Sequence, residues 1–274
     1  MAVILSNCHT HSLYCDGKDS IRSMADTALA LGFESIGFTG HAMQYFDLDY
    51  AMSPDGTASY SRDISDLKRE LDGRIRIWHG IERDFFSYDE PGRYDYYIAS
   101  VHYLPHGDSM VAVDGRPEQL SQLLHDRYGG SGLKLAEEYY ELLSLYARCW
   151  HPPIIGHLDL VKKYNQRLDL FDENSGGYRQ LILQTLRAIR SCGSLLEVNT
   201  GGMARGYIWD PYPSPWILRE WKTLGGDVIV SSDCHRKEYL NYAFDRIPSL
   251  LRELGYHRIF ILGKSDSLFE TMDL

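Results

Sequence analysis

The sequence has no run of apolar residues long enough to cross a membrane, and its first residues lack the basic segment and long apolar stretch of a secretory signal. We therefore expect a cytoplasmic protein with no membrane partner. Apolar residues make up 44% of the chain and charged residues 24%, as in ordinary globular proteins. A chain of 274 residues can bury a large core without disulfide bonds.

Cysteines are few, and their spacing is irregular. The chain has five, with no Cys-x-x-Cys pair among them: Cys8, Cys15, Cys149, Cys192 and Cys234. An odd, unpatterned set excludes a disulfide framework and a cysteine-rich zinc site. We expect most of the five to be buried thiols that serve as small packing residues.

Positive charge is also scarce. The 28 Lys and Arg residues compare with 38 Asp and Glu residues, so the formal net charge is −10, and no basic cluster is longer than Lys162-Lys163. Nucleic acids and anionic membranes bind basic surfaces, so neither is an expected partner. A small phosphorylated metabolite remains compatible with an acidic protein if bound cations reverse the sign of charge locally. The sequence leaves the oligomeric state open.

The chain alternates apolar, β-branched runs with segments of helical periodicity, which predicts an α/β fold with a parallel sheet in one domain, residues 1–274. Seven strands with helices between them would close into a (β/α) barrel. The predicted strands are 2–8, 34–39, 75–81, 95–101, 153–156, 194–199 and 227–232, with 257–262 as either an eighth strand or only an edge extension. The predicted helices are 20–31, 60–72, 133–148, 177–191, 214–224 and 241–254. Residues from about 103 to 133 are expected to form a long irregular flap on the substrate side.

Histidines and acidic residues follow these strands. In a parallel barrel the carboxyl ends of all strands open onto one face, where barrel enzymes place their active sites. The residues expected to meet there are His9, His11, Asp16, His41, Glu82, His102, His157, Asp233 and His235. His79 should point to the opposite face, and His106, His125, His151 and His257 are interpreted as ordinary loop or helix residues.

So many imidazoles and carboxylates in one concavity would leave buried polar groups unsatisfied unless cations bound them. The mixture suits zinc, manganese or iron, and nine ligands are enough for two or three divalent ions with Glu82 as a bridge. Such ions would make a cationic hole for phosphate and would hold a hydroxide that attacks phosphorus. We therefore predict a metal-dependent phosphomonoesterase.

The order of these residues resembles the motifs of the polymerase-and-histidinol-phosphatase (PHP) superfamily over nearly the whole chain. Four contexts resemble its histidinol-phosphatase branch: residues 12–17 (SLYCDG), 100–103 (SVHY), 156–159 (GHLD) and 197–202 (EVNTGG). The resemblance implies a distorted (β/α)7 barrel, a trinuclear metal centre and hydrolysis of L-histidinol phosphate in histidine biosynthesis. One departure is Gly40, where many members carry an Asp that would support His41 but would not be a ligand.

The resemblance also implies how the ligands divide. His9, His11, Glu82 and Asp233 would hold one ion, and Glu82 would bridge to a second ion on His102 and His157. Asp16, His41 and His235 would hold the third. Asp233 and His235 are the residues expected to move protons, so they join Glu82 as predicted catalytic residues.

For binding of the substrate phosphate, Arg205 in a glycine-containing loop is the first candidate, followed by Lys162 or Lys163. Asp159 is expected to orient a metal-binding imidazole. Aromatic residues at 45–46, 103 and 207–212 are candidates for contacts with the substrate's imidazole ring. Two alternatives stay open: a phosphoesterase of the same superfamily acting on phosphotyrosine, a nucleotide or another small monoester, and a metal-binding module without catalysis.

Overall fold

Short apolar runs form the strands of one curled sheet in the computed structural model, which describes residues 3–274. Neighbouring strands are parallel except for the last pair, which is antiparallel. The strands lie side by side in chain order: β1 (Ser6–Asn7), β2 (Ser35–Phe38), β3 (Arg76–Asp84), β4 (Tyr96–Ser100), β7 (Ile154–Ile155), β8 (Leu195–Asn199), β9 (Val228–Ser231), β10 (Arg258–Leu262) and β11 (Phe269–Asp273).

The sheet curls until its first strand meets β9. Just beyond these two strands, Thr10 and Cys234 form an isolated parallel bridge, and the His11 amide donates to the Cys234 carbonyl at 3.0 Å. At the other end of the barrel, β10 lies against β1 and β2, where the Ser35 hydroxyl donates to the Leu262 carbonyl at 2.7 Å. The predicted distorted barrel of seven parallel strands is therefore confirmed, with β10 as the extension expected at 257–262. The first residue of the predicted strand 2–8 lies outside the described residues.

The inside of the barrel changes from apolar to polar along its strands. Near the strand starts, one buried apolar cluster fills it: Cys8, Trp78, Tyr96, Ile98, Ile154, Leu195, Ile229 and Leu262. Because side chains of a strand alternate between faces, the next inward residues lie two positions further on. These are Ser100 after Ile98, Glu197 after Leu195 and Ser231 after Ile229, all buried. The polar layer lies directly beneath the strand ends, where its side chains can hydrogen-bond to the residues above them.

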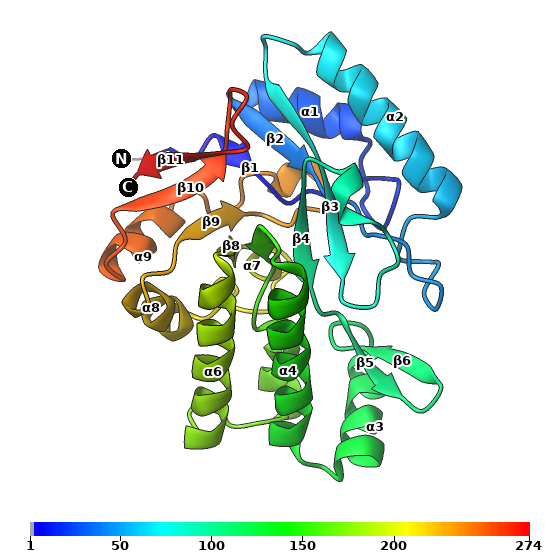
Figure 1. Ribbon diagram of the computed structural model, residues 1–274, viewed down its shortest axis with the longest axis vertical. Helices are drawn as coiled ribbons and strands as arrows, with labels where there is room; N and C mark the ends of the chain where they lie inside the picture. Colours follow the sequence, from blue (N-terminus) through cyan, green and yellow to red (C-terminus); the bar gives the residue numbers. More distant parts are fainter. Residues whose placement is uncertain (1–2) are drawn as a thin grey trace.

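Amphipathic helices cover the outside of the sheet and bury a second, larger core (Figure 1). Serine side chains cap four of the longer helices by accepting a backbone N–H three residues later, at Ser20, Ser53, Ser131 and Ser175. The α-helices are α1 (Ile21–Ala30), α2 (Pro54–Glu70), α3 (Pro117–Tyr128), α4 (Gly132–Trp150), α5 (Asn165–Leu168), α6 (Gly176–Cys192), α7 (Gly201–Ala204), α8 (Pro215–Thr223) and α9 (Ile247–Glu253).

Residues 103–133 are not the irregular flap that the sequence suggested. They contain the hairpin β5 (Tyr103–His106) and β6 (Ser109–Ala112), followed by α3, and Figure 1 shows both beside the lower end of α4. Gly107, with φ of 61°, makes the hairpin turn, and Gly129, with φ of 59°, ends α3. Glycine and proline recur along this stretch, at 107, 115, 117, 129, 130 and 132, so its short elements were interpreted as one continuous loop. Two helix boundaries were also wrong, because α2 begins earlier, at Pro54, and α9 begins later, at Ile247.

The expectation that most cysteines are buried was wrong. Cys8 and Cys234 are buried, Cys15 and Cys192 are half-buried, and Cys149 is exposed; all five are free thiols. Within residues 3–274, no helix combines the length and the apolar content that a membrane crossing requires.

Two leucines on α4 test the assignment of the outer core. Leu143 is fully buried in it, whereas Leu145 is 42% exposed. Leu143→Ala should lower the free energy of unfolding by about 2–5 kcal/mol, because it leaves a cavity in a packed core. Leu145→Ala should lower it by less than about 1 kcal/mol. Urea unfolding of the two variants measures the difference, and equal losses would contradict the packing described.

Candidate metal centre

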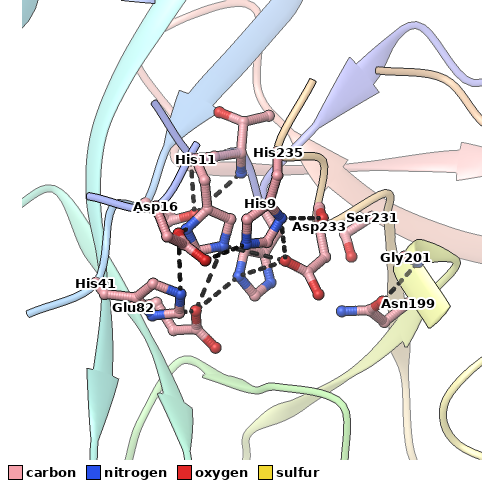
Figure 2. Close-up of polar contacts among 12 residues, drawn as sticks. His9, His11, Asp16, His41, Glu82, Asn199, Gly201, Ser231, Asp233 and His235 are labelled. Atoms are coloured by element: carbon pink, nitrogen blue, oxygen red, sulfur yellow. Dashed lines mark hydrogen bonds and ion pairs between the residues drawn. The ribbon is translucent and has the colours of Figure 1, made fainter. Parts of the chain in front are cut away.

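Nine side chains from separate segments meet at the carboxyl end of the barrel. They come from the segments after β1, β2, β4, β7 and β9, together with Glu82 inside the long strand β3. Figure 2 shows seven of them pointing toward one another: His9, His11, Asp16, His41, Glu82, Asp233 and His235. His102 and His157 approach from the side of β4 and β7. All nine positions predicted as metal ligands therefore lie together.

Glu82 lies in the middle of this group and is 1% exposed. Its two oxygens face different histidines. Oε2 lies 3.1 Å from His9 Nε2, 3.5 Å from His11 Nε2 and 3.0 Å from His41 Nδ1. Oε1 lies 2.9 Å from His157 Nε2 and 3.3 Å from His102 Nε2, and it accepts a hydrogen bond of 2.8 Å from Ser100. One carboxylate therefore separates two sets of imidazoles, as a bridging ligand would.

Asp233 and Asp16 complete the arrangement. Asp233 Oδ1 lies 3.1 Å from His11 Nε2 and 3.6 Å from His9 Nε2. Its φ of 46° is a left-handed conformation that Asp tolerates better than most residues. This bend lets the carboxylate face the centre while Cys234 returns to pair with Thr10. Asp16 Oδ2 lies 3.0 Å from His235 Nε2, and Asp16 Oδ1 lies 3.6 Å from His41 Nε2.

Several of these atoms are buried without a hydrogen-bond partner, among them His9 Nε2, His11 Nε2, Asp16 Oδ1 and Glu82 Oε2. A buried polar atom left in this state costs about 1–3 kcal/mol, so the cluster needs a further partner. Three groups have ligand atoms close enough to share an ion: His11, Asp16, His41 and His235; His9, His11 and Asp233; and His41, Glu82 and His102. Mixed imidazole and carboxylate donors suit zinc, manganese and iron. The residues fit divalent metal ions.

Two of the candidate ligands, His11 and Glu82, have pKa shifts that favour the forms a metal binds. Burial and the neighbouring His235 and His41 lower the pKa of His11 to about 3, so its ring is neutral at physiological pH. Burial alone would raise the pKa of Glu82, but His9, His41 and His102 hold it well below its ordinary value. A neutral imidazole and an ionised carboxylate are the forms that bind metals.

A cavity of about 300 Å³ opens above the cluster. Besides the metal-ligand candidates, its polar wall contains Asp47, Tyr50, Tyr103, Asp114, Lys163, Arg205 and Tyr207. Tyr50 stacks on His41 with ring centroids 3.8 Å apart, and the Tyr103 hydroxyl donates to Asp47 at 2.8 Å. Asp114 lies in the segment between β6 and α3, so the region predicted as a flap does reach the cavity wall.

Arg205 lies in the cavity wall next to the metal cluster. Its guanidinium donates to the Asp233 carbonyl at 3.0 Å and to Asp233 Oδ2 at 3.1 Å, and it lies 3.1 Å from His235 Nδ1. The neighbouring Gly201 makes this approach feasible, because a Cβ there would lie 3.0 Å from Arg205 Nη2. The guanidinium of Arg205 thus lies beside the position that an anion bound at the cluster would occupy.

The two candidate lysines have different surroundings. Lys163 lines the cavity, and its ammonium donates to the Asp114 carbonyl at 2.7 Å. Lys162 is buried, does not line the cavity, and pairs with Asp159 at 2.7 Å and with the Ser214 hydroxyl. The expectation that Asp159 orients an imidazole was wrong, because its Oδ2 binds Lys162 and Ser214.

Glu197, which the sequence interpretation missed, is the carboxylate that contacts the imidazole of His9. Its Oε1 lies 2.6 Å from His9 Nδ1. One signal was present: an acid within the apolar strand run 194–199, on the inward face by alternation from Leu195. Asp47 and Asp114 were also missed, and they lie in loops where no periodicity predicts direction. His79 points away from the centre as predicted, with its ring 5.4 Å from Tyr60 and 4.9 Å from Tyr94.

Comparison with known proteins identifies a matching family and similar relatives. The family described as "PHP domain" matches residues 7–201. Histidinol-phosphatase of Bacillus subtilis is 30% identical over 86% of this chain and 96% of its own length. A probable histidinol-phosphatase of Deinococcus radiodurans is 28% identical over 92% of this chain and 94% of its own length.

Among solved structures, histidinol phosphate phosphatase of Lactococcus lactis, complexed with zinc, L-histidinol and phosphate, has the same fold. The TM-score is 0.72, at 23% identity over 94% of this chain and 96% of that protein.

Metal binding should stabilise the fold, because the unpartnered ligand atoms gain partners only in the folded chain. Each ion present at about one thousand times its Kd should add about 4 kcal/mol to the free energy of unfolding. Urea unfolding of chelator-treated protein, with and without added zinc, measures this. Glu82→Ala should reduce the increase, whereas His79→Ala, outside the centre, should leave it unchanged. No effect of zinc on wild-type stability would contradict the site.

Proposed function

The chain belongs to the PHP domain family, and on this premise we propose that it hydrolyses L-histidinol phosphate to L-histidinol and phosphate in histidine biosynthesis. The observation that carries the proposal is the convergence of nine candidate metal ligands beneath a cavity that also contains an arginine. Relatives of the same function match the chain over nearly their whole length. The cytoplasmic location stays a prediction.

We assign the ligands as three sets. His9, His11, Glu82 and Asp233 would hold one ion, Glu82, His102 and His157 a second, and Asp16, His41 and His235 a third. The opposite orientation of the two Glu82 oxygens supports the bridging role. His11 and His41 each reach two of the three geometric groups, so two to three ions are compatible with the donors. Zinc is bound by the Lactococcus lactis protein, and manganese and iron suit the same donors.

Divalent ions in such a site supply a hydroxide nucleophile at neutral pH and neutralise charge on the phosphate oxygens. The chain's own residues would do the rest. Arg205 would bind two phosphate oxygens with its planar guanidinium. Asp233 Oδ2, which faces Arg205, is the atom proposed to accept and return a proton, with His235 as the second choice. Burial opposes ionisation of Asp233, but Arg205 and His9 hold its pKa well below the ordinary value, so the carboxylate is ionised at neutral pH.

The outer part of the cavity fits the alcohol half of this substrate. L-Histidinol carries an ammonium group and an imidazole ring, and the wall offers two carboxylates and several tyrosines for them. Asp114 is the preferred partner of the ammonium. Burial would raise the pKa of Asp114, but Lys163 and nearby histidines keep it below its ordinary value, so the carboxylate is charged. Lys163 would then set the position of Asp114, and Lys162, which lies outside the cavity, has no role in this proposal.

Phosphate release from L-histidinol phosphate tests the activity directly. We expect turnover by the metal-loaded protein, loss after chelation, and recovery when zinc or manganese is returned, because the nucleophile depends on the ions. A panel of phosphotyrosine, nucleotides and other monoesters should be hydrolysed more slowly. Glu82→Ala should lose bound metal and turnover together. Activity that survives complete metal removal would refute the proposal.

Asp114→Asn tests recognition of the alcohol half. Loss of one charge-assisted contact, about 1.5–3 kcal/mol, should lower kcat/KM for L-histidinol phosphate by about 10- to 100-fold, mostly through KM. The effect on 4-nitrophenyl phosphate, whose alcohol has no positive charge, should be much smaller. Asp108→Asn, in the exposed hairpin turn, is the matched control. An equal loss with both substrates would instead indicate damage to the metal centre.

A further inference from the structure

Glu197 lies at the level where the inside of the barrel becomes polar, and its side chain is 0% exposed. Four groups from β1, β7, β8 and β9, or from the residues just beyond these strands, reach its two oxygens. Oε1 lies 2.6 Å from His9 Nδ1 and accepts a hydrogen bond of 2.6 Å from the Ser231 hydroxyl. Oε2 accepts hydrogen bonds from the His157 amide at 2.7 Å and from Asn199 Nδ2 at 3.1 Å. A buried carboxylate with every oxygen engaged in this way is ionised and well ordered.

The contact with His9 determines which ring nitrogen carries the proton. A carboxylate oxygen 2.6 Å away accepts a hydrogen bond, so the proton must lie on Nδ1. In the neutral ring, the form that binds a metal, the lone pair then lies on Nε2, which faces Glu82 Oε2 at 3.1 Å and Asp233 Oδ1 at 3.6 Å. The opposite tautomer would place two lone pairs against each other at Nδ1 and direct an N–H at the position of the ion. Only the first tautomer is able to bind a metal through Nε2.

The contact with the His157 amide acts on a different ligand. It fixes the backbone immediately after β7, at the residue whose ring reaches Glu82 Oε1 with Nε2 at 2.9 Å. Gly156 lies just before it, and a Cβ there would lie 2.6 Å from Ser100 Oγ, so the backbone passes close to the polar layer. Glu197 therefore contacts one ligand on each side of the Glu82 carboxylate.

From this geometry we propose that Glu197 is a positioning residue, which selects the metal-binding tautomer of His9 and fixes His157 for the neighbouring ion. The inference rests on the proposed function only in that the centre holds metal; it makes no use of the substrate. Glu197 belongs to none of the groups that could hold an ion, and it does not line the cavity. Its effect is on how tightly and in what number the ions are held.

Glu197→Gln tests the proposal with almost no change in volume. The amide oxygen can accept on the side of His157 or on the side of His9, but the NH2 group then faces the other side as a donor. We expect about a 10- to 100-fold weaker affinity for one ion, measured by chelator competition, and a lower metal content by elemental analysis. Turnover of L-histidinol phosphate should fall in kcat, with KM little changed.

Ser231→Ala is the matched control, because it removes a hydrogen bond to the same Oε1 oxygen and leaves the acceptor for His9 in place. Its metal affinity should stay within about threefold of wild type, since one neutral hydrogen bond contributes little. If Ser231→Ala loses as much metal as Glu197→Gln, general disruption of the polar layer explains both results and the proposal is overturned.

A second measurement needs no change at Glu197. In zinc-loaded wild-type protein labelled with nitrogen-15, NMR should show His9 protonated at Nδ1 and metal-bound at Nε2, with assignment from a His9→Asn variant. A proton on Nε2 overturns the proposal, even if Glu197→Gln fails to fold. A wild-type protein that binds no metal would overturn the proposed function as well. Wild-type affinity in Glu197→Gln, beside a metal-loaded wild type, would overturn this inference alone.

Discussion

Five imidazole rings surround the buried Glu82 carboxylate, and burying so many polar groups costs free energy that bound cations would offset. Hydrogen bonds within the protein satisfy one side of it: Ser100 donates to Glu82, and Glu197 accepts from His9. The side facing the cavity keeps unpartnered atoms. The fold therefore brings the candidate ligands close together, and metal binding is expected to add to the free energy of unfolding.

The barrel explains why residues 9 and 235 can meet. Parallel strands place their carboxyl ends at one edge, and the bridge between Thr10 and Cys234 joins the first and last ligand segments. The apolar layer at the strand starts contains large side chains such as Trp78 and Tyr96, and the polar layer packs directly on top of it. The change from Leu195 to Glu197 along a single strand shows how two residues of spacing separate core from site.

The alternation of side chains along strands also explains how much of the fold and of the site the sequence could predict. Strand runs, helix caps and residues that directly follow a strand have local signals, so the barrel and the nine converging positions could be inferred. Asp47 and Asp114 had no such signal, because the direction of a loop side chain depends on packing between distant segments. The hairpin β5–β6 was missed because its turn residues lie close to those that flank α3. Asp159 was given the role of Glu197 because proximity in sequence to His157 was weighted above alternation along a strand.

The distribution of charge in the protein favours one kind of substrate. A protein with a net charge of −10 repels phosphate at long range, so attraction has to come from ions at the base of the cavity and from Arg205 beside them. The outer wall keeps its carboxylates, at Asp47 and Asp114, and these attract a positive group. A substrate with a phosphate at one end and an ammonium at the other fits this gradient in one orientation only, because reversal would place like charges together at both ends. An uncharged or anionic alcohol gains nothing from the outer wall. The acidic character that argues against nucleic acid as a partner thus favours a small zwitterionic phosphate ester.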